Sequence, residues 1–168
     1  YRDTLLFCHG GSYNLSVFNL SDPDTLRLVT TITLEGEGEY WRLWNIAVTE
    51  NLLAATDRQN VFLVDISKLE APKLLSKTVV PGSEQMSIGN DRLYIMSEGI
   101  VKIFDIADPT DPRNLGEYDT PGRVWDVEAY GNDLLVADWS GFLRIRPDAI
   151  TSVEEDDPPD EPVPATSM

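Results

Sequence analysis

The sequence carries two copies of a short pattern in which one apolar residue separates an arginine from a tryptophan. The copies are RLWNIA at residues 42–47 and RVWDVE at residues 123–128, which lie 81 residues apart. Arginine and tryptophan are enriched among the residues that dominate the binding energy of protein interfaces. The pattern therefore predicts a binding surface, whose members are Arg42, Trp44, Arg123 and Trp125. The alternative, that these large side chains fill the centre of a repeat fold, stays open at this point.

Acidic side chains near the two patterns are the candidates for catalysis. Aspartates act as general acids or bases, and arginines stabilise developing negative charge. A lyase or hydrolase would use Asp57, Asp126 and Asp138, with Arg58 and Arg123 as charge stabilisers. The GxSxG, HExxH, CxxC and phosphate-loop motifs are absent from the sequence. We therefore expect a non-catalytic binding domain, with an acid-based enzyme as one alternative and a purely structural spacer as another.

Metal and cofactor chemistry finds few ligands in this sequence. The single cysteine and the single histidine, Cys8 and His9, are adjacent, and neighbours on a strand point to opposite faces. They are therefore poorly placed to bind one metal ion together. The acids of the proline-rich turns lack the spacing of a calcium-binding loop; they are Asp22, Asp24, Asp108 and Asp111. We expect no metal and no cofactor.

Charge and composition exclude several classes of partner. The 168 residues include 29 acids and 13 bases, which gives a net charge of −16. Nucleic acids and anionic membrane surfaces require a basic footprint, so neither is an expected partner. Apolar residues make up 42% of the chain, but no apolar run reaches the ~20 residues of a membrane-spanning helix. Residues 1–20 also lack the pattern of a signal peptide.

The chain repeats itself at a nearly fixed interval. Residues 53–82 align with residues 93–122 at an offset of 40, without a gap. A third segment, which starts at Leu135, aligns with the second at an offset of 42 and places Leu143 over Val101. An earlier segment, VFNLSDPDTLRLV, fits the second copy at an offset of 86. Intervals of ~40–45 residues are typical of helical pairs or of four-stranded propeller blades.

The composition of each repeat favours strands over helices. Segments such as VFLVDI (61–66) are short and β-branched, and they end in turns whose prolines would interrupt a helix. Both faces of this segment are apolar, with Val61 and Leu63 on one and Phe62 and Val64 on the other. A strand with two apolar faces lies between neighbouring sheets, and stacked blades provide that environment.

We therefore predict an all-β fold, a partial β-propeller, over residues 1–150. Each repeat supplies four antiparallel strands, and about fourteen strands make about three and a half blades. Closed propellers have about 4–8 blades, so we expect this segment to be the C-terminal part of a larger ring. Asn19, Asp65 and Asp105 each close the third strand of a repeat, where we expect their side chains to form Asx turns.

Two sets of loops should lie together on one face of the arc: those before each first strand, and those between each second and third strand. The second set contains HGGSYN, DRQN, SEG and DWSG, which differ from copy to copy, whereas the turns of the opposite face repeat. Loops without a structural duty are where a scaffold places recognition, so we expect a protein or glycan partner on this face. The expected binding residues are Arg42, Trp44, Asp57, Arg58, Arg123, Trp125, Asp126, Asp138 and Trp139, with Trp41 nearby.

The repeated segments resemble a known family. GNDRLYIM, IVKIFDIADPTDPRNLGEYDTPG and VWDVEAYGNDLLVADWSGFLRI are similar to the LVIVD-repeat β-propellers, and the resemblance covers residues ~4–146. Departures occur at Asn19, where aspartate is usual, and at Arg146–Pro147, which replaces the last turn. The resemblance implies a secreted or cell-surface bacterial or archaeal protein and implies no established enzymatic activity.

The composition changes after Ile150. Residues 151–168 contain six acids, four prolines and no base. Such a segment buries too little apolar surface to fold, so we expect a disordered, extended linker.

Overall fold

The computed structural model describes residues 4–10, 13–22, 24–34 and 42–147. Those residues form fourteen β-strands, so the predicted all-β class and strand number are confirmed. The strands are β1 (Leu5–His9), β2 (Asn14–Asn19), β3 (Arg27–Thr33), β4 (Asn45–Val48), β5 (Leu52–Thr56), β6 (Asn60–Asp65), β7 (Lys73–Val79), β8 (Ser83–Gly89), β9 (Arg92–Ser97), β10 (Ile100–Asp105), β11 (Arg113–Tyr118), β12 (Val124–Tyr130), β13 (Asp133–Asp138) and β14 (Gly141–Ile145).

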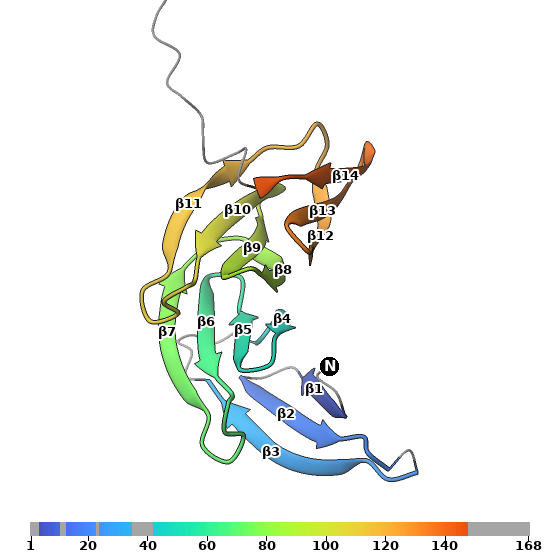
Figure 1. Ribbon diagram of the computed structural model, residues 1–168, viewed down its shortest axis with the longest axis vertical. Coiled ribbons are helices and arrows are strands. Elements are labelled where there is room, and N and C mark those ends of the chain that lie inside the picture. The colour runs from blue at the N-terminus through green and yellow to red at the C-terminus, as the bar shows by residue number, and fades with distance from the viewer. Residues whose placement is uncertain (1–3, 11–12, 23, 35–41, 148–168) are drawn as a thin grey trace, which may run out of the picture.

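The strands form four antiparallel sheets, which we call blades 1 to 4 in chain order. Blade 1 contains β1–β3, blade 2 contains β4–β7, blade 3 contains β8–β11 and blade 4 contains β12–β14. The blades stand side by side along an open arc, with β4, β8 and β12 on its inner side and β3, β7 and β11 on its outer side (Figure 1). Among the described residues blade 1 has three strands, β1–β3, and blade 4 has three, β12–β14, which agrees with the expected three and a half blades.

Apolar side chains pack between the blades and hold the arc together. On β6, Phe62 and Val64 enter the core shared with blade 1, whereas Val61 and Leu63 enter the core shared with blade 3. All four are buried. The predicted two-faced strand is therefore confirmed, because each inner blade has a sheet on either side.

The turn after each third strand is fixed by its own side chain. Asp65 accepts a hydrogen bond from the Ser67 backbone N–H at 2.8 Å, and Asp105 accepts one from Ala107 at 2.9 Å. Asn19 accepts the equivalent bond from Ser21 at 2.7 Å. The three Asx turns expected from the sequence are therefore confirmed, and these polar groups have a structural role.

The offset of 42 predicted for the last repeat is wrong by one residue. Phe142 pairs with Ala137 as Val101 pairs with Met96, so the strands of blade 4 follow those of blade 3 by 41 residues. Leu143 accordingly faces the core shared with blade 3. The alignment that placed Leu143 over Val101 is therefore shifted by one residue, and such a slip reverses the face on which every side chain of a strand lies.

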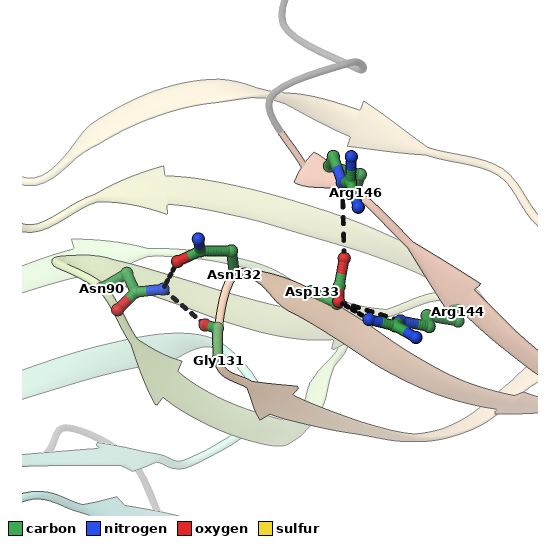
Figure 2. A network of polar contacts seen from close by, with 6 residues as sticks. All are labelled: Asn90, Gly131, Asn132, Asp133, Arg144 and Arg146. Atoms are coloured by element: carbon green, nitrogen blue, oxygen red, sulfur yellow. Dashed lines mark hydrogen bonds and ion pairs between the residues drawn. The ribbon is translucent and has the colours of Figure 1, made fainter.

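The outer face of blade 4 has no neighbouring blade among the described residues. Val61 and Val101 are buried against the next blade, whereas Phe142 at the equivalent place is 90% exposed. Polar contacts hold the strand ends nearby (Figure 2). Arg144 Nε donates to Asp133 Oδ2 at 2.8 Å, on the outer face of blade 4.

The turns opposite the predicted binding face connect blades 3 and 4. Asn90 Nδ2 donates to Asn132 Oδ1 at 3.0 Å and to the Gly131 carbonyl oxygen (Figure 2). These turns therefore support the stacking of blades. The predicted linker at residues 151–168, the boundary at Ile150 and Trp41 lie outside the described residues, so those expectations stay predictions.

Candidate binding rim

The loops that differ between copies lie on one face of the arc, which runs along all four blades. Because neighbouring strands are antiparallel, the start of each first strand lies beside the end of the second strand. The Trp44 N–H donates to the Thr56 carbonyl at 2.7 Å, and the Trp139 N–H donates to the Arg123 carbonyl at 3.2 Å. We call this face the rim. It contains every predicted binding residue, from Arg42 to Trp139.

The rim of blade 2 combines an indole with two guanidinium groups. The Trp44 ring is 39% exposed, and its centroid lies 4.8 Å from Arg58 Cζ and 5.7 Å from Arg42 Cζ. Both distances are within the range of cation–π attraction. Arg58 also forms an ion pair with Glu84 at the start of blade 3. Arg42 has no ion-pair partner among the residues that the structure describes.

A hollow opens beside Trp44, at the boundary between blades 1 and 2. Its volume is about 260 Å³, and its lining includes His9, Arg42, Leu43 and Trp44. Leu43 is buried, whereas His9 and Arg42 are exposed. His9, considered above only as a poor metal ligand, is a member of this lining that was not predicted. Its position at the end of β1, just before a variable loop, was the available signal.

The rim of blade 4 is an aromatic platform. The rings of Trp125 and Trp139 are stacked, with centroids 5.8 Å apart and planes at 30°. The two residues are 53% and 71% exposed, and Arg123 Cζ lies 5.8 Å from the Trp125 centroid. A Cβ atom on Gly122 would lie 3.1 Å from Trp139 Cβ, so the absence of a side chain at Gly122 lets the Trp139 loop approach.

Trp44, Trp125 and Trp139 are exposed and do not fill the space between neighbouring blades. Their chain neighbours Leu43 and Val124 do so, because both are buried in the inter-blade cores. The two indoles that follow them, Trp44 and Trp125, point to the surface. Trp44 and Trp125 lie at or just before the starts of β4 and β12, on the inner side of the open arc, so both interpretations left open by the sequence stay predictions.

Blade 3 carries acids at the equivalent rim positions. Glu84 stands where blades 2 and 4 have Trp44 and Trp125, and Glu98 stands where they have Arg58 and Trp139. None of the binding residues expected from the sequence lies on blade 3. Aligning the copies at the rim, once the offset of 41 is known, would have found both glutamates. The rim thus alternates along the arc between cationic–aromatic, acidic and cationic–aromatic sections.

Two of the predicted aspartates are engaged by their own loops. The Asp57 carboxylate accepts hydrogen bonds from the backbone N–H groups of Gln59 at 2.8 Å and Asn60 at 2.6 Å. Asp138 accepts bonds from Ser140, Gly141 and Gly122, and both aspartates are buried. They therefore fix the loops that present Arg58 and Trp139.

The electrostatics of Asp138 also favour a structural role. Its hydrogen bond from the Ser140 hydroxyl lowers the pKa of its carboxyl, which keeps the group ionised. A general acid needs a raised pKa instead. Asp126 is exposed and accepts a hydrogen bond from the next backbone N–H, that of Val127, at 3.0 Å. Each of the three candidate catalytic acids thus accepts a hydrogen bond from a backbone N–H group.

The described part of the chain contains no group of three or more metal-binding side chains. It also contains no helix long and apolar enough to cross a membrane.

Comparison with known proteins identifies the repeat in the last blade. Residues 121–145, which include the three strands of blade 4, match the LVIVD repeat. The resemblance predicted from the sequence is thereby confirmed. The search of curated proteins found no matching sequence.

Solved structures with the same fold are propellers. The WD40 repeats of RRP9 share 14% identity over 81% of this chain and 42% of theirs, with a TM-score of 0.64. BamB from Moraxella catarrhalis shares 13% identity over 85% of this chain and 42% of its own, with a TM-score of 0.62. The computationally designed Ika4 protein shares 10% identity over 87% of both chains, with a TM-score of 0.61.

These likenesses establish the fold alone. The chain spans 42% of the length of the first two of these structures. The partial β-propeller predicted from the repeats is confirmed by the sheets and by these neighbours.

Proposed function

We propose that this chain is a non-catalytic binding domain of an exported or cell-surface protein, and that its rim recognises a protein or glycan partner. The observation that carries the proposal is the stacked, exposed pair of Trp125 and Trp139 beside Arg123. Large exposed aromatic side chains beside an arginine are typical of the centre of a binding surface. In a chain of net charge −16 they stand apart from the rest of the surface.

The fold itself does not require these side chains. Blade 3 forms the same sheet with Glu84 and Glu98 at the corresponding places. Blade stacking depends on the buried positions, whereas the rim positions vary from blade to blade. A purely structural spacer would have no use for the platform, so the platform favours recognition.

The enzyme alternative is the less favoured one. Its candidate acids Asp57 and Asp138 are occupied by backbone N–H groups of their own loops. Turnover would need a pair of carboxylates that face a common space.

The test compares the wild-type chain with the double variant Trp125→Ala/Trp139→Ala on a glycan array and on a displayed peptide library. We expect ligands of the wild-type protein to bind the double variant at least about tenfold more weakly, because two hot-spot side chains are lost. The matched control is Tyr130→Ala, since Tyr130 is 68% exposed at the other end of β12.

Equal binding by the wild-type and double-variant chains, or a wild-type chain that binds neither glycans nor peptides, would contradict the proposal. The location is tested separately, by protease accessibility of the protein on intact cells of its source.

A further inference from the structure

The hollow between blades 1 and 2 has the chemistry of a small anion site. Two blades contribute to it, since His9 comes from β1 and Arg42 and Trp44 come from the start of blade 2. Its volume of about 260 Å³ lies below the range of pockets that enclose a whole ligand. It therefore suits one side chain or one chain end of a larger ligand.

Among the described residues, the charged groups near the hollow differ in whether they have a partner. Arg58 is paired with Glu84, and the Asp57 carboxylate is occupied by its own loop. Arg42 contacts the Trp44 ring but no carboxylate among the described residues. A guanidinium presents a planar fork of N–H donors that matches a carboxylate, and an imidazole adds a further donor.

We propose that this hollow binds a carboxylate of an acidic peptide, with Arg42 and His9 as donors and Trp44 packing beside it. The proposal rests on the proposed function and extends it to a part of the rim away from the blade 4 platform. Leu43 is buried and forms the side of the hollow toward the core, whereas His9 and Arg42 are exposed and accessible to a ligand.

The alternation of charge along the rim defines the rest of the ligand. The three sections follow one another on blades 2, 3 and 4. An extended peptide of about six residues spans about 20 Å, which is long enough to contact all three. Glu84 is paired with Arg58, but Glu98 of blade 3 is exposed between the two cationic–aromatic sections and disfavours an acidic residue at the centre of the peptide. A peptide with an acidic end, a neutral or basic centre and an aromatic end fits the three sections in order.

The experiment measures fluorescence polarisation with labelled peptides of about six residues. The first peptide has blocked ends, glutamate first, lysine in the middle and tryptophan last; the second replaces the glutamate with glutamine. A third carries its carboxylate only as a free C-terminus, in reversed order. The first and third peptides distinguish a side-chain source of the carboxylate from a chain end.

We expect Arg42→Gln to weaken binding of the carboxylate peptide at least about tenfold and to leave the glutamine peptide unaffected. Arg42→Lys should restore only part of the affinity, because an ammonium group lacks the guanidinium fork. The control variant is Arg27→Gln, since Arg27 is exposed at the opposite end of blade 1. Near-ultraviolet circular dichroism checks that each variant is folded.

The outcomes separate this inference from the proposed function. If Trp125→Ala/Trp139→Ala weakens binding but Arg42→Gln does not, the carboxylate site is refuted and the binding domain stands. If neither variant changes the affinity, both are refuted. If the wild-type chain binds an anionic glycan and none of the peptides, the peptide is the wrong ligand class.

Discussion

Two phenylalanines on equivalent strands test how the arc is held together. Phe62 on β6 is fully buried between blades 1 and 2, whereas Phe142 on β14 is 90% exposed on the outer face of blade 4. The same substitution, phenylalanine to alanine, therefore removes a core side chain in one variant and a surface side chain in the other.

The expected costs differ by several kilocalories per mole. Truncating a buried phenylalanine typically lowers the free energy of unfolding by about 3–5 kcal/mol, which we expect for Phe62→Ala. An enclosed phenylalanine buries about 200 Å². The tenth of its surface that Phe142 buries is therefore about 20 Å², which is worth about 0.5 kcal/mol.

The assay is urea denaturation of the full chain, followed by tryptophan fluorescence at two protein concentrations. A Phe142→Ala cost above about 1.5 kcal/mol, or a concentration-dependent midpoint, would mean that the outer face of blade 4 is covered in solution. A Phe62→Ala cost below about 1 kcal/mol would refute the packing of β6 between two blades.

Three further predictions concern single sites. Gly122→Ala should displace the Trp139 loop and change the tryptophan fluorescence emission spectrum of the Trp125–Trp139 pair, because its Cβ would approach Trp139 Cβ to 3.1 Å; an unchanged emission spectrum would refute this. Burial, with a contribution from Asp57, raises the pKa of Tyr13 to about 12 from 10.0. Stability from the neutral phenol is therefore intact below pH 10 and lost as the pH rises to about 12, and Tyr13→Phe should lessen that loss in alkaline denaturation. Truncation after Ile150 should leave the melting temperature within a few degrees, and a larger drop in calorimetry would show that the tail docks.

The blade architecture could be predicted because its determinants are local. A strand such as β6, apolar on both faces, leaves few alternatives to a sheet enclosed by two others. The Asx residues Asp65 and Asp105 mark the same turn in successive copies. Hydrophobic alternation and turn chemistry are both visible in the letters of the sequence, so the strands and their order followed from it.

The rim was predictable only in part. Arg42, Trp44 and the residues of blade 4 stood out because they recur at a fixed interval. Glu84 and Glu98 did not, since a glutamate attracts attention only when it is aligned with the tryptophans that it replaces. His9 needed a neighbouring blade, because the hollow that it lines forms between two sheets. A contact between two copies depends on the residues of both copies, so it cannot be predicted from the sequence of one repeat alone.

The one-residue change in register bears on the origin of the platform. Gly82 and Gly122 lie 40 residues apart, but the strand starts Ser83 and Val124 lie 41 apart. The additional residue is Arg123, which stands in the junction before β12. An insertion within the strand would have turned its side chains to the wrong face. In the junction it leaves the buried positions unchanged and adds a guanidinium beside Trp125. Blade 3 forms its sheet without this additional residue, so the place of the Arg123 guanidinium beside Trp125 favours recognition as its role.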